Sequence, residues 1–346
     1  MRRNKHLAAF AAVLLSAALL CACGTVSPVA AEAPAAATEA PTARQDTQAP
    51  KSANEIRFRF ADAQEGVERR YAQTKFFDNL TQNDLDYRLQ KNGATVDDYK
   101  ALIKASTRDF SDDEKQLITN AVEYIEKRFA EIGFEWPVED EVVFISTTMD
   151  EECGTAAYTH SADIYIGSNI TAYVFKGWMD IESFNNIMAH EIFHVLSRNV
   201  PELRAQIYSI IGFEICPPPE FSEDVRAHII SNPDVEDYDC AGEFTIDGRK
   251  EKATIIFYAP DFDETDPQSF MDSGYAAVVP YSDPGKAYVY SDVADFFDVV
   301  GYNTDYVIAA EECMADNFSF AVVPITGMEY YSPEILQAIL DILAGF

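Results

Sequence analysis

Basic residues are scarce in this chain of 346 residues: 26 Lys and Arg stand against 58 Asp and Glu, for a formal net charge of −32. A surface this acidic is repelled by nucleic-acid phosphates, which argues against a DNA or RNA partner. Apolar residues nevertheless make up 48% of the chain and aromatic residues 12%. The chain therefore has the side chains to bury a core and differs from a disordered acidic tail.

Several common sequence motifs are also missing. The chain contains no G-x-S-x-G, no Walker A loop and no G-x-G-x-x-G. Nucleophile-elbow hydrolases and folds that cradle phosphates in a glycine-rich loop therefore have no support. No apolar run after the first 23 residues is long enough to predict a membrane-spanning helix.

The beginning of the chain is typical of a targeting segment. Three of the first five residues are basic, and the apolar run that follows, residues 7–20, is too short to span a bilayer comfortably. Its end, Leu-Cys-Ala-Cys-Gly, resembles the signal of bacterial lipoproteins, with Cys23 as the lipid acceptor. Residues 1–23 are therefore predicted to be a lipoprotein signal peptide; a plain cleaved signal is the alternative. We expect an exported protein, lipid-anchored to the bacterial cell membrane and facing away from the cytoplasm.

The rest of the chain divides into a linker and one folded domain. Residues 24–54 are rich in Ala, Pro, Thr and Glu and hold no aromatic residue, which predicts a disordered spacer. Residues 55–346 are expected to fold, with helices first, then two strands, then a helix over 181–197 that is apolar on most sides. A β-rich insert is predicted over 215–300, before helices return. This order indicates an α+β fold with a mostly helical core and a small mixed sheet.

The apolar helix carries the pattern His190-Glu191-Ile-Phe-His194. Residues four apart lie about 40° apart around a helix, so both imidazoles point the same way. Two neutral imidazoles at this spacing can share one zinc ion, and Glu191 then reaches a water molecule on that ion. The alternative is a pair of core histidines without a metal, but burying two His and a Glu is costly unless they are paired or metal-bound. The pattern predicts one Zn²⁺ per chain.

A catalytic zinc site needs a third protein ligand and keeps one position open. The longer HExxHxxGxxH pattern fails, because neither its Gly nor its third His is present. Glu214 and Glu312 remain as candidates. Asp316 lies four residues after Glu312 on an expected helix, so one carboxylate can bind the metal while the other orients a histidine. The prolines that follow Glu214 offer no such helix. We therefore expect Glu312 beside His190 and His194, with Asp316 behind them.

The HExxH helix and the later helical Glu-x-x-x-Asp together resemble the glutamate-zincin metallopeptidases, such as the thermolysin-like enzymes. The long gap and the run Glu-Glu-Cys-Met-Ala-Asp-Asn-Phe look more like the C-terminal domain of anthrax lethal factor. The resemblance covers two helices and a preceding strand, and the large insert departs from it. It implies that His190, His194 and Glu312 hold zinc and that Glu191 is the base. It also implies that strand 162–167 is the sheet edge along which an extended peptide substrate lies.

An oxyanion-stabilising side chain is expected near the zinc. Tyr306 is the nearest candidate in sequence, because it precedes the expected third ligand by six residues. His160 and His228 are the alternatives. Each of the three is also of a type that commonly packs in a core or lies on the surface.

Four cysteines remain beyond the predicted signal peptide. Cys216 and Cys240 flank a proline-rich loop and are predicted either to form a disulfide outside the cell or to stay as buried free thiols. Cys313 lies next to Glu312 but lacks the partner spacing of a thiolate zinc site, so we expect it in the helix core.

Together these patterns predict a secreted, lipid-anchored zinc metallopeptidase whose catalytic domain is residues 55–346. The expected substrate is a peptide or protein, the cofactor is one zinc ion, and the membrane is contacted through the lipid anchor only. The rival interpretation is a surface lipoprotein that binds a ligand or protein on the same scaffold, with structural zinc or none. Glu191 favours the enzyme, because a structural site needs no base. A fourth protein side chain that closes the metal site would favour the rival.

Overall fold

The computed structural model describes residues 55–260 and 274–346. The predicted signal peptide, the acceptor Cys23 and the predicted linker lie outside these residues. Within them, no helix has both the length and the apolar character needed to cross a membrane.

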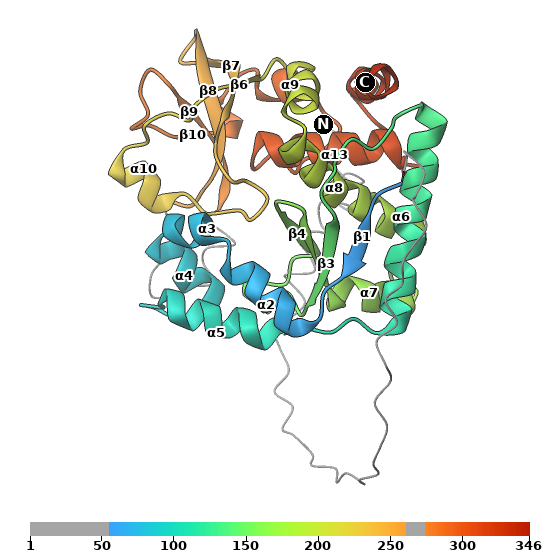
Figure 1. Cartoon of the computed structure of the whole chain (residues 1–346). Helices are drawn as coiled ribbons and strands as arrows, with labels where there is room; N and C mark the ends of the chain where they lie inside the picture. The colour runs from blue at the N-terminus through green and yellow to red at the C-terminus, as the bar shows by residue number, and fades with distance from the viewer. Residues whose placement is uncertain (1–54, 261–273) are drawn as a thin grey trace, which may run out of the picture.

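The described chain forms an α+β fold, as predicted, with a mixed sheet and an antiparallel sheet among its helices (Figure 1). The helices are α2 (Ala63–Tyr71), α3 (Thr74–Asn79), α4 (Gln82–Leu89), α5 (Val96–Ser106), α6 (Asp112–Ile132), α7 (Ser168–Phe175), α8 (Ile181–Asn199), α9 (Pro201–Ser209), α10 (Glu223–His228), α12 (Phe296–Val300), α13 (Ala310–Val322) and α14 (Pro333–Gly345). The strands are β1 (Phe58–Phe60), β2 (Thr107–Arg108), β3 (Val142–Thr147), β4 (Ala157–His160), β5 (Asp163–Gly167), β6 (Glu214–Ile215), β7 (Cys240–Ile246), β8 (Arg249–Tyr258), β9 (Tyr275–Pro280) and β10 (Tyr288–Val289).

The mixed sheet has the strand order β1-β3-β5-β4, with β2 paired to β3. Strands β1, β3 and β5 are parallel, and β4 runs antiparallel to β5 at the edge. The expectation that 162–167 is the edge strand is therefore wrong, because β4 covers its outer side. The two strands are joined by a tight turn in which Ser161 takes a left-handed conformation (φ 55°). This turn folds the short strand back against its successor, so the edge lies one strand earlier in the sequence.

Helices cover both faces of the mixed sheet (Figure 1). Side chains alternate along β3, so Val142 and Phe144 face the main core with α6 and α8, whereas Val143 and Ile145 join a smaller cluster with Tyr158 and Tyr165. The helices α2 to α5 pack on the side of that smaller cluster. One face of the edge strand β4 thus packs against the N-terminal helices.

The long helix α6 begins at a capping box and ends at a glycine. Ser111 caps its first turn by accepting from the amide of Glu114, and the Glu114 side chain in turn accepts from the Ser111 amide. Gly133 ends the helix in a left-handed conformation (φ 89°), which a residue without Cβ adopts at little cost.

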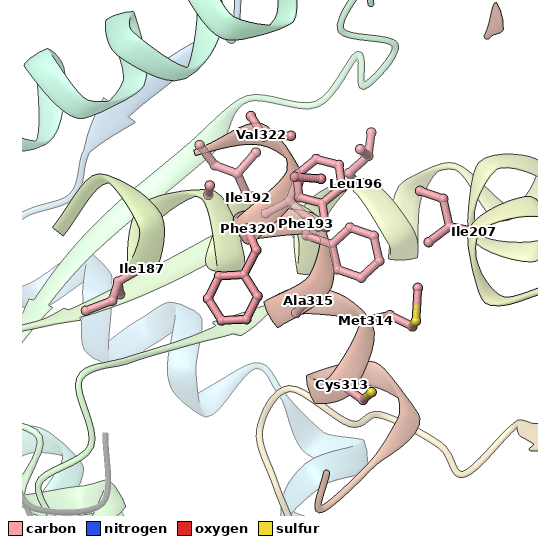
Figure 2. Close-up of a cluster of buried hydrophobic side chains, with 14 of the residues drawn as sticks. Ile187, Ile192, Phe193, Leu196, Ile207, Cys313, Met314, Ala315, Phe320 and Val322 are labelled. Carbon is pink, nitrogen blue, oxygen red and sulfur yellow. The ribbon is translucent and has the colours of Figure 1, made fainter. Parts of the chain in front are cut away.

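Helices α8 and α13 cross in the centre of the core. Apolar side chains of both belong there to one buried cluster with Ile207 of α9 (Figure 2), and the rings of Phe193 of α8 and Phe318 of α13 lie 4.8 Å apart. A fully buried aliphatic or aromatic side chain contributes about 1.5–3 kcal/mol through its removal from water. This packing fixes the two helices against each other and so positions the polar side chains that they present on another side.

The β-rich insert is an antiparallel sheet in the order β10-β9-β8-β7-β6, with α10 and α12 attached. It lies beside the helical core and next to α3 and α4 (Figure 1). The predicted β-rich insert is therefore present, with β7, β8, β9 and β10 among its strands.

Candidate metal centre

Helix α8 places the HExxH pattern in the interior of the molecule. Asp180 caps its start by accepting from the amide of Ser183, and Pro201 begins the next helix after it. The rings of His190 and His194 lie on one face, with centroids 4.9 Å apart. The side chains are thus arranged as the i, i+4 spacing predicts.

Helix α13 brings two carboxylates to these histidines. Glu312 Oε2 lies 3.1 Å from His190 Nε2 and 3.6 Å from His194 Nε2. Asp316 Oδ1 lies 2.9 Å from the other ring nitrogen of His190, Nδ1, and Asp316 also accepts from the hydroxyl of Thr304. One carboxylate thus faces both imidazoles while the next one along the helix orients a ring.

Three of these residues could hold a metal ion. Ligand atoms of His190, His194 and Glu312 all lie within 4.8 Å of one another, and all three residues are buried. His194 Nε2 is buried and has no hydrogen-bond partner within the part of the chain that the structure describes. A buried nitrogen without a partner is costly, and a metal ion between the three ligand atoms would satisfy it. Two imidazoles and one carboxylate are a donor set that suits zinc.

The protonation of these groups also fits a metal. Burial lowers the pKa of His194 to about 4, so its imidazole is neutral, as a metal ligand must be. Burial alone would raise the pKa of Glu312, but the hydrogen bond with His190 and the nearby ring of His194 outweigh it and hold this pKa below its ordinary value. For His190, burial is outweighed by hydrogen bonds with Asp316 and Glu312, which raise its pKa well above the ordinary value. A metal ion would replace the proton between His190 and Glu312.

Glu191 lies beside the triad without belonging to it. Its Oε2 accepts a hydrogen bond of 2.7 Å from the hydroxyl of Thr159, which belongs to the edge strand β4. Burial raises the pKa of Glu191 to about 7, although His190 and Thr159 act in the opposite direction. A carboxyl group with a pKa near neutrality both accepts and returns a proton readily at that pH, as a general base and acid must.

The competing glutamate, Glu214, lies elsewhere. It is an exposed residue of β6 and pairs with Lys252 of β8. Of the two candidate glutamates, the structure therefore brings Glu312 to the histidines. Glu311, its neighbour, faces another direction and binds Arg204.

The candidates for oxyanion stabilisation separate in the structure. The ring of Tyr306 lies 6.3 Å from that of His190, and burial together with nearby Glu312 raises its pKa well above the ordinary value. The hydroxyl of Tyr306 is therefore a neutral donor near the triad. His160 packs on the far side of β4 against Phe76, and His228 binds a backbone carbonyl of its own helix.

Other site residues escaped the sequence analysis because loops and strand pairing deliver them. Asn232 donates to Glu312 Oε1, and Asp234 Oδ1 lies 3.9 Å from His194 Nε2. Thr159 lies on β4, the edge strand, which the sequence analysis placed at 162–167 instead. The location of Arg198 near the site could have been predicted, because Arg198 lies one turn after His194 on the same helix.

The two cysteines near the proline-rich loop are free thiols. Strands β6 and β7 pair Ile215 with Cys240, and the amide of Cys216 donates to the carbonyl of Asp239. Cys216 and Cys240 are therefore not opposite each other in the register. Of the two predicted states, the structure has the unpaired one, with Cys240 buried and Cys216 partly exposed.

Comparison with known proteins gives this chain no relative: no family model, no curated protein and no solved structure matches it. What the chain shares with the glutamate-zincins is the spacing and burial of His190, His194 and Glu312 in a mostly helical α+β fold.

Proposed function

We propose that this protein is an exported zinc metallopeptidase, held at the bacterial membrane through a lipid on Cys23. The observation that carries the proposal is the buried triad of His190, His194 and Glu312 with Glu191 beside it. A bound zinc ion would polarise the scissile carbonyl and lower the pKa of water. The substrate is a peptide or protein in extended form.

Each residue of the site has a separate role in the proposed hydrolysis. Glu191, held by Thr159, accepts a proton from the attacking water and returns it to the leaving amine. Asp316 fixes the ring of His190, and Glu312 supplies negative charge between the two histidines. Tyr306 offers a neutral hydroxyl toward developing negative charge on the carbonyl oxygen.

Glu191→Gln tests the proposal most directly. Glutamine keeps the volume and can still bind Thr159, but it cannot accept a proton at neutral pH. We expect the variant to fold, to retain one zinc per chain and to cleave a peptide from a mixed library at least about 100-fold more slowly. Zinc content by mass spectrometry and the rate of cleavage check this. Wild-type protein that neither contains nor takes up zinc would refute the metal site, and equal cleavage rates would refute the role of Glu191.

The membrane anchor has its own test. Wild-type protein should partition with membranes, and Cys23→Ser should be released or remain unprocessed, because lipid attachment needs the thiol. Identical partitioning and processing of the two forms would remove the anchor from the proposal and leave the peptidase untouched.

A second function, ligand or protein binding with structural zinc, is favoured by one observation. Asn232 and Asp234 reach the triad, and Asp234 stands beside His194 where a catalytic centre needs open space. A zinc-loaded wild type that cuts no peptide, together with a Glu191→Gln variant of unchanged zinc affinity and stability, would support this second function. Cleavage that depends on Glu191 would exclude it.

A further inference from the structure

The segment between α10 and β7, residues 229–239, crosses the open side of the edge strand beside the metal centre. It leaves from the β-rich insert, where Ile229 bridges to Tyr258 and the amide of Ile230 donates to the carbonyl of Phe257. The insert thus delivers a loop to the helical core. The middle of that loop, residues 232–234, is here called the plug.

The plug binds the backbone of Thr159 in β4. The Thr159 N–H donates to Asp234 Oδ1 at 2.6 Å, and the Thr159 carbonyl accepts from Arg198 Nη1 at 2.7 Å. Arg198 also donates to the carbonyl of Pro233 at 3.3 Å, so one guanidinium joins α8, the edge strand and the plug. These two groups of Thr159 are the ones that an added peptide strand would use. Asp234 of the plug and Arg198 therefore occupy the backbone groups that a substrate strand would bind.

The same segment also covers the metal triad. Asn232 donates to Glu312 Oε1, the oxygen that does not face the histidines. Asp234 Oδ1 lies 3.9 Å from His194 Nε2, and Asp234 is only 7% exposed. Since Thr159 holds Glu191 as well, the plug touches the strand, the base's partner and a metal-binding residue at once.

We propose that the plug is an internal inhibitor and that this structure is the latent form of the peptidase. An extended peptide reaches Glu191 only after the contacts of Asp234 and Arg198 with Thr159 open. This inference rests on the proposed function and adds a form of regulation to it. A substrate backbone brings its own carbonyl and N–H to Thr159, so exchanging the plug for a peptide restores both hydrogen bonds of the Thr159 backbone.

The construction of the segment suits such an exchange. Beyond the plug, Glu236 and Asp237 are exposed: Asp237 pairs with Lys75 of α3 at the surface, and Glu236 Oε1 lies 3.8 Å from Arg198 Nε. The plug contacts the core through side-chain hydrogen bonds rather than through strand pairing. Opening it therefore requires no change in the packing of α8 against α13.

Asp234→Ala tests the plug, with Asp237→Ala as the matched control from the same segment. Two rates are measured on the purified zinc-loaded protein: loss of zinc to excess EDTA, and hydrogen–deuterium exchange of the β4 amides. We expect Asp234→Ala to lose zinc at least about tenfold faster and the Thr159 amide to exchange faster by a similar factor. Asp237→Ala should match wild type in both. Cleavage of library peptides should also be faster in Asp234→Ala than in wild type, and a wild type that cuts no peptide supports the binding function only if Asp234→Ala cuts none either.

Arg198→Ala repeats the test from α8 if Asp234→Ala does not fold, as judged by circular dichroism and thermal melting. Zinc loss and Thr159 exchange at the wild-type rates in a folded variant would overturn the inference. Equally fast zinc loss and Thr159 exchange in Asp237→Ala would also overturn it, because the effect would then come from a general destabilisation of the segment. If the protein takes up no zinc, the proposed function fails, and the exchange rates measured without metal still decide whether the plug closes the edge strand.

Discussion

The helical core and the β-rich insert use their carboxylates in opposite ways. In the core, Glu312 and Asp316 are buried and bind a histidine that lies more than a hundred residues earlier in the chain. In the insert, Glu214 pairs with Lys252 at the surface, and Asp295 binds Lys250 and the strand β7. Burial against histidine side chains, rather than the presence of a carboxylate, distinguishes the candidate metal-binding group from an ordinary ion pair.

The largest expected difference between the regions is in metal binding by the two glutamates. Glu312→Ala removes the one carboxylate between His190 and His194, so zinc affinity should fall at least about 100-fold, more than the loss of an orienting residue costs. Glu214→Ala removes an exposed ion pair and should leave zinc affinity unchanged. Competition titration with a zinc indicator measures both. Zinc loss in Glu214→Ala with retention in Glu312→Ala would reverse the comparison.

A second, smaller difference concerns two aspartates. Asp316→Ala frees the ring of His190, so zinc affinity should fall about 10- to 100-fold. Asp295→Ala in the insert should bind zinc as wild type does, because the carboxylate of Asp295 accepts from Lys250 and Thr245 of the insert rather than from a histidine. Equal zinc affinity in both variants would mean that Asp316 does not orient the ring.

Asp295 contributes to the stability of the fold, and the size of this contribution depends on pH. Burial acts to raise its pKa, but hydrogen bonds with Lys250 and Thr245 lower it to about 2, from an ordinary 3.8. A carboxyl group with a depressed folded pKa stabilises the fold above its unfolded pKa, and this contribution is lost as pH falls toward the folded value. The stability lost in Asp295→Asn should thus be full at pH 7 and should diminish between about pH 4 and pH 2, as thermal melting would report.

The smallest expected difference separates two tyrosines. Tyr306→Phe removes one neutral donor beside the triad and should lower kcat for a cleaved peptide about tenfold, the value of one ordinary hydrogen bond, with zinc content unchanged. Tyr281→Phe in the insert removes a hydroxyl that binds Pro217, and kcat should stay at the wild-type value. Equal kcat values for Tyr306→Phe and wild type would show that Tyr306 does not stabilise the oxyanion.

Local spacing predicted the parts of the site that lie on helices. His190 and His194 at i, i+4, and Glu312 and Asp316 at the same spacing, each occupy one face of a continuous helix, so the sequence alone orients them. The capping box at Ser111 was readable for the same reason, because all of its groups lie within four residues.

Strand pairing and the placement of loops could not be read in this way. The run Ala157–His160 is short, and nothing in it indicates that it would cover the outer side of β5. Asn232 and Asp234 lie in a loop without periodicity, so their approach to Glu312 and His194 depends on how the insert folds back. The strand order and the plug are properties of the tertiary structure, set by contacts that no local pattern encodes.

The side chains around Thr159 have a consequence for self-association. A sheet edge with unpaired backbone groups is a template on which the same strand of another molecule can pair, and such pairing leads to aggregates. Asp234 and Arg198 occupy both backbone groups of Thr159. In this closed arrangement the two side chains therefore keep the strand from pairing with the same strand of a neighbouring copy.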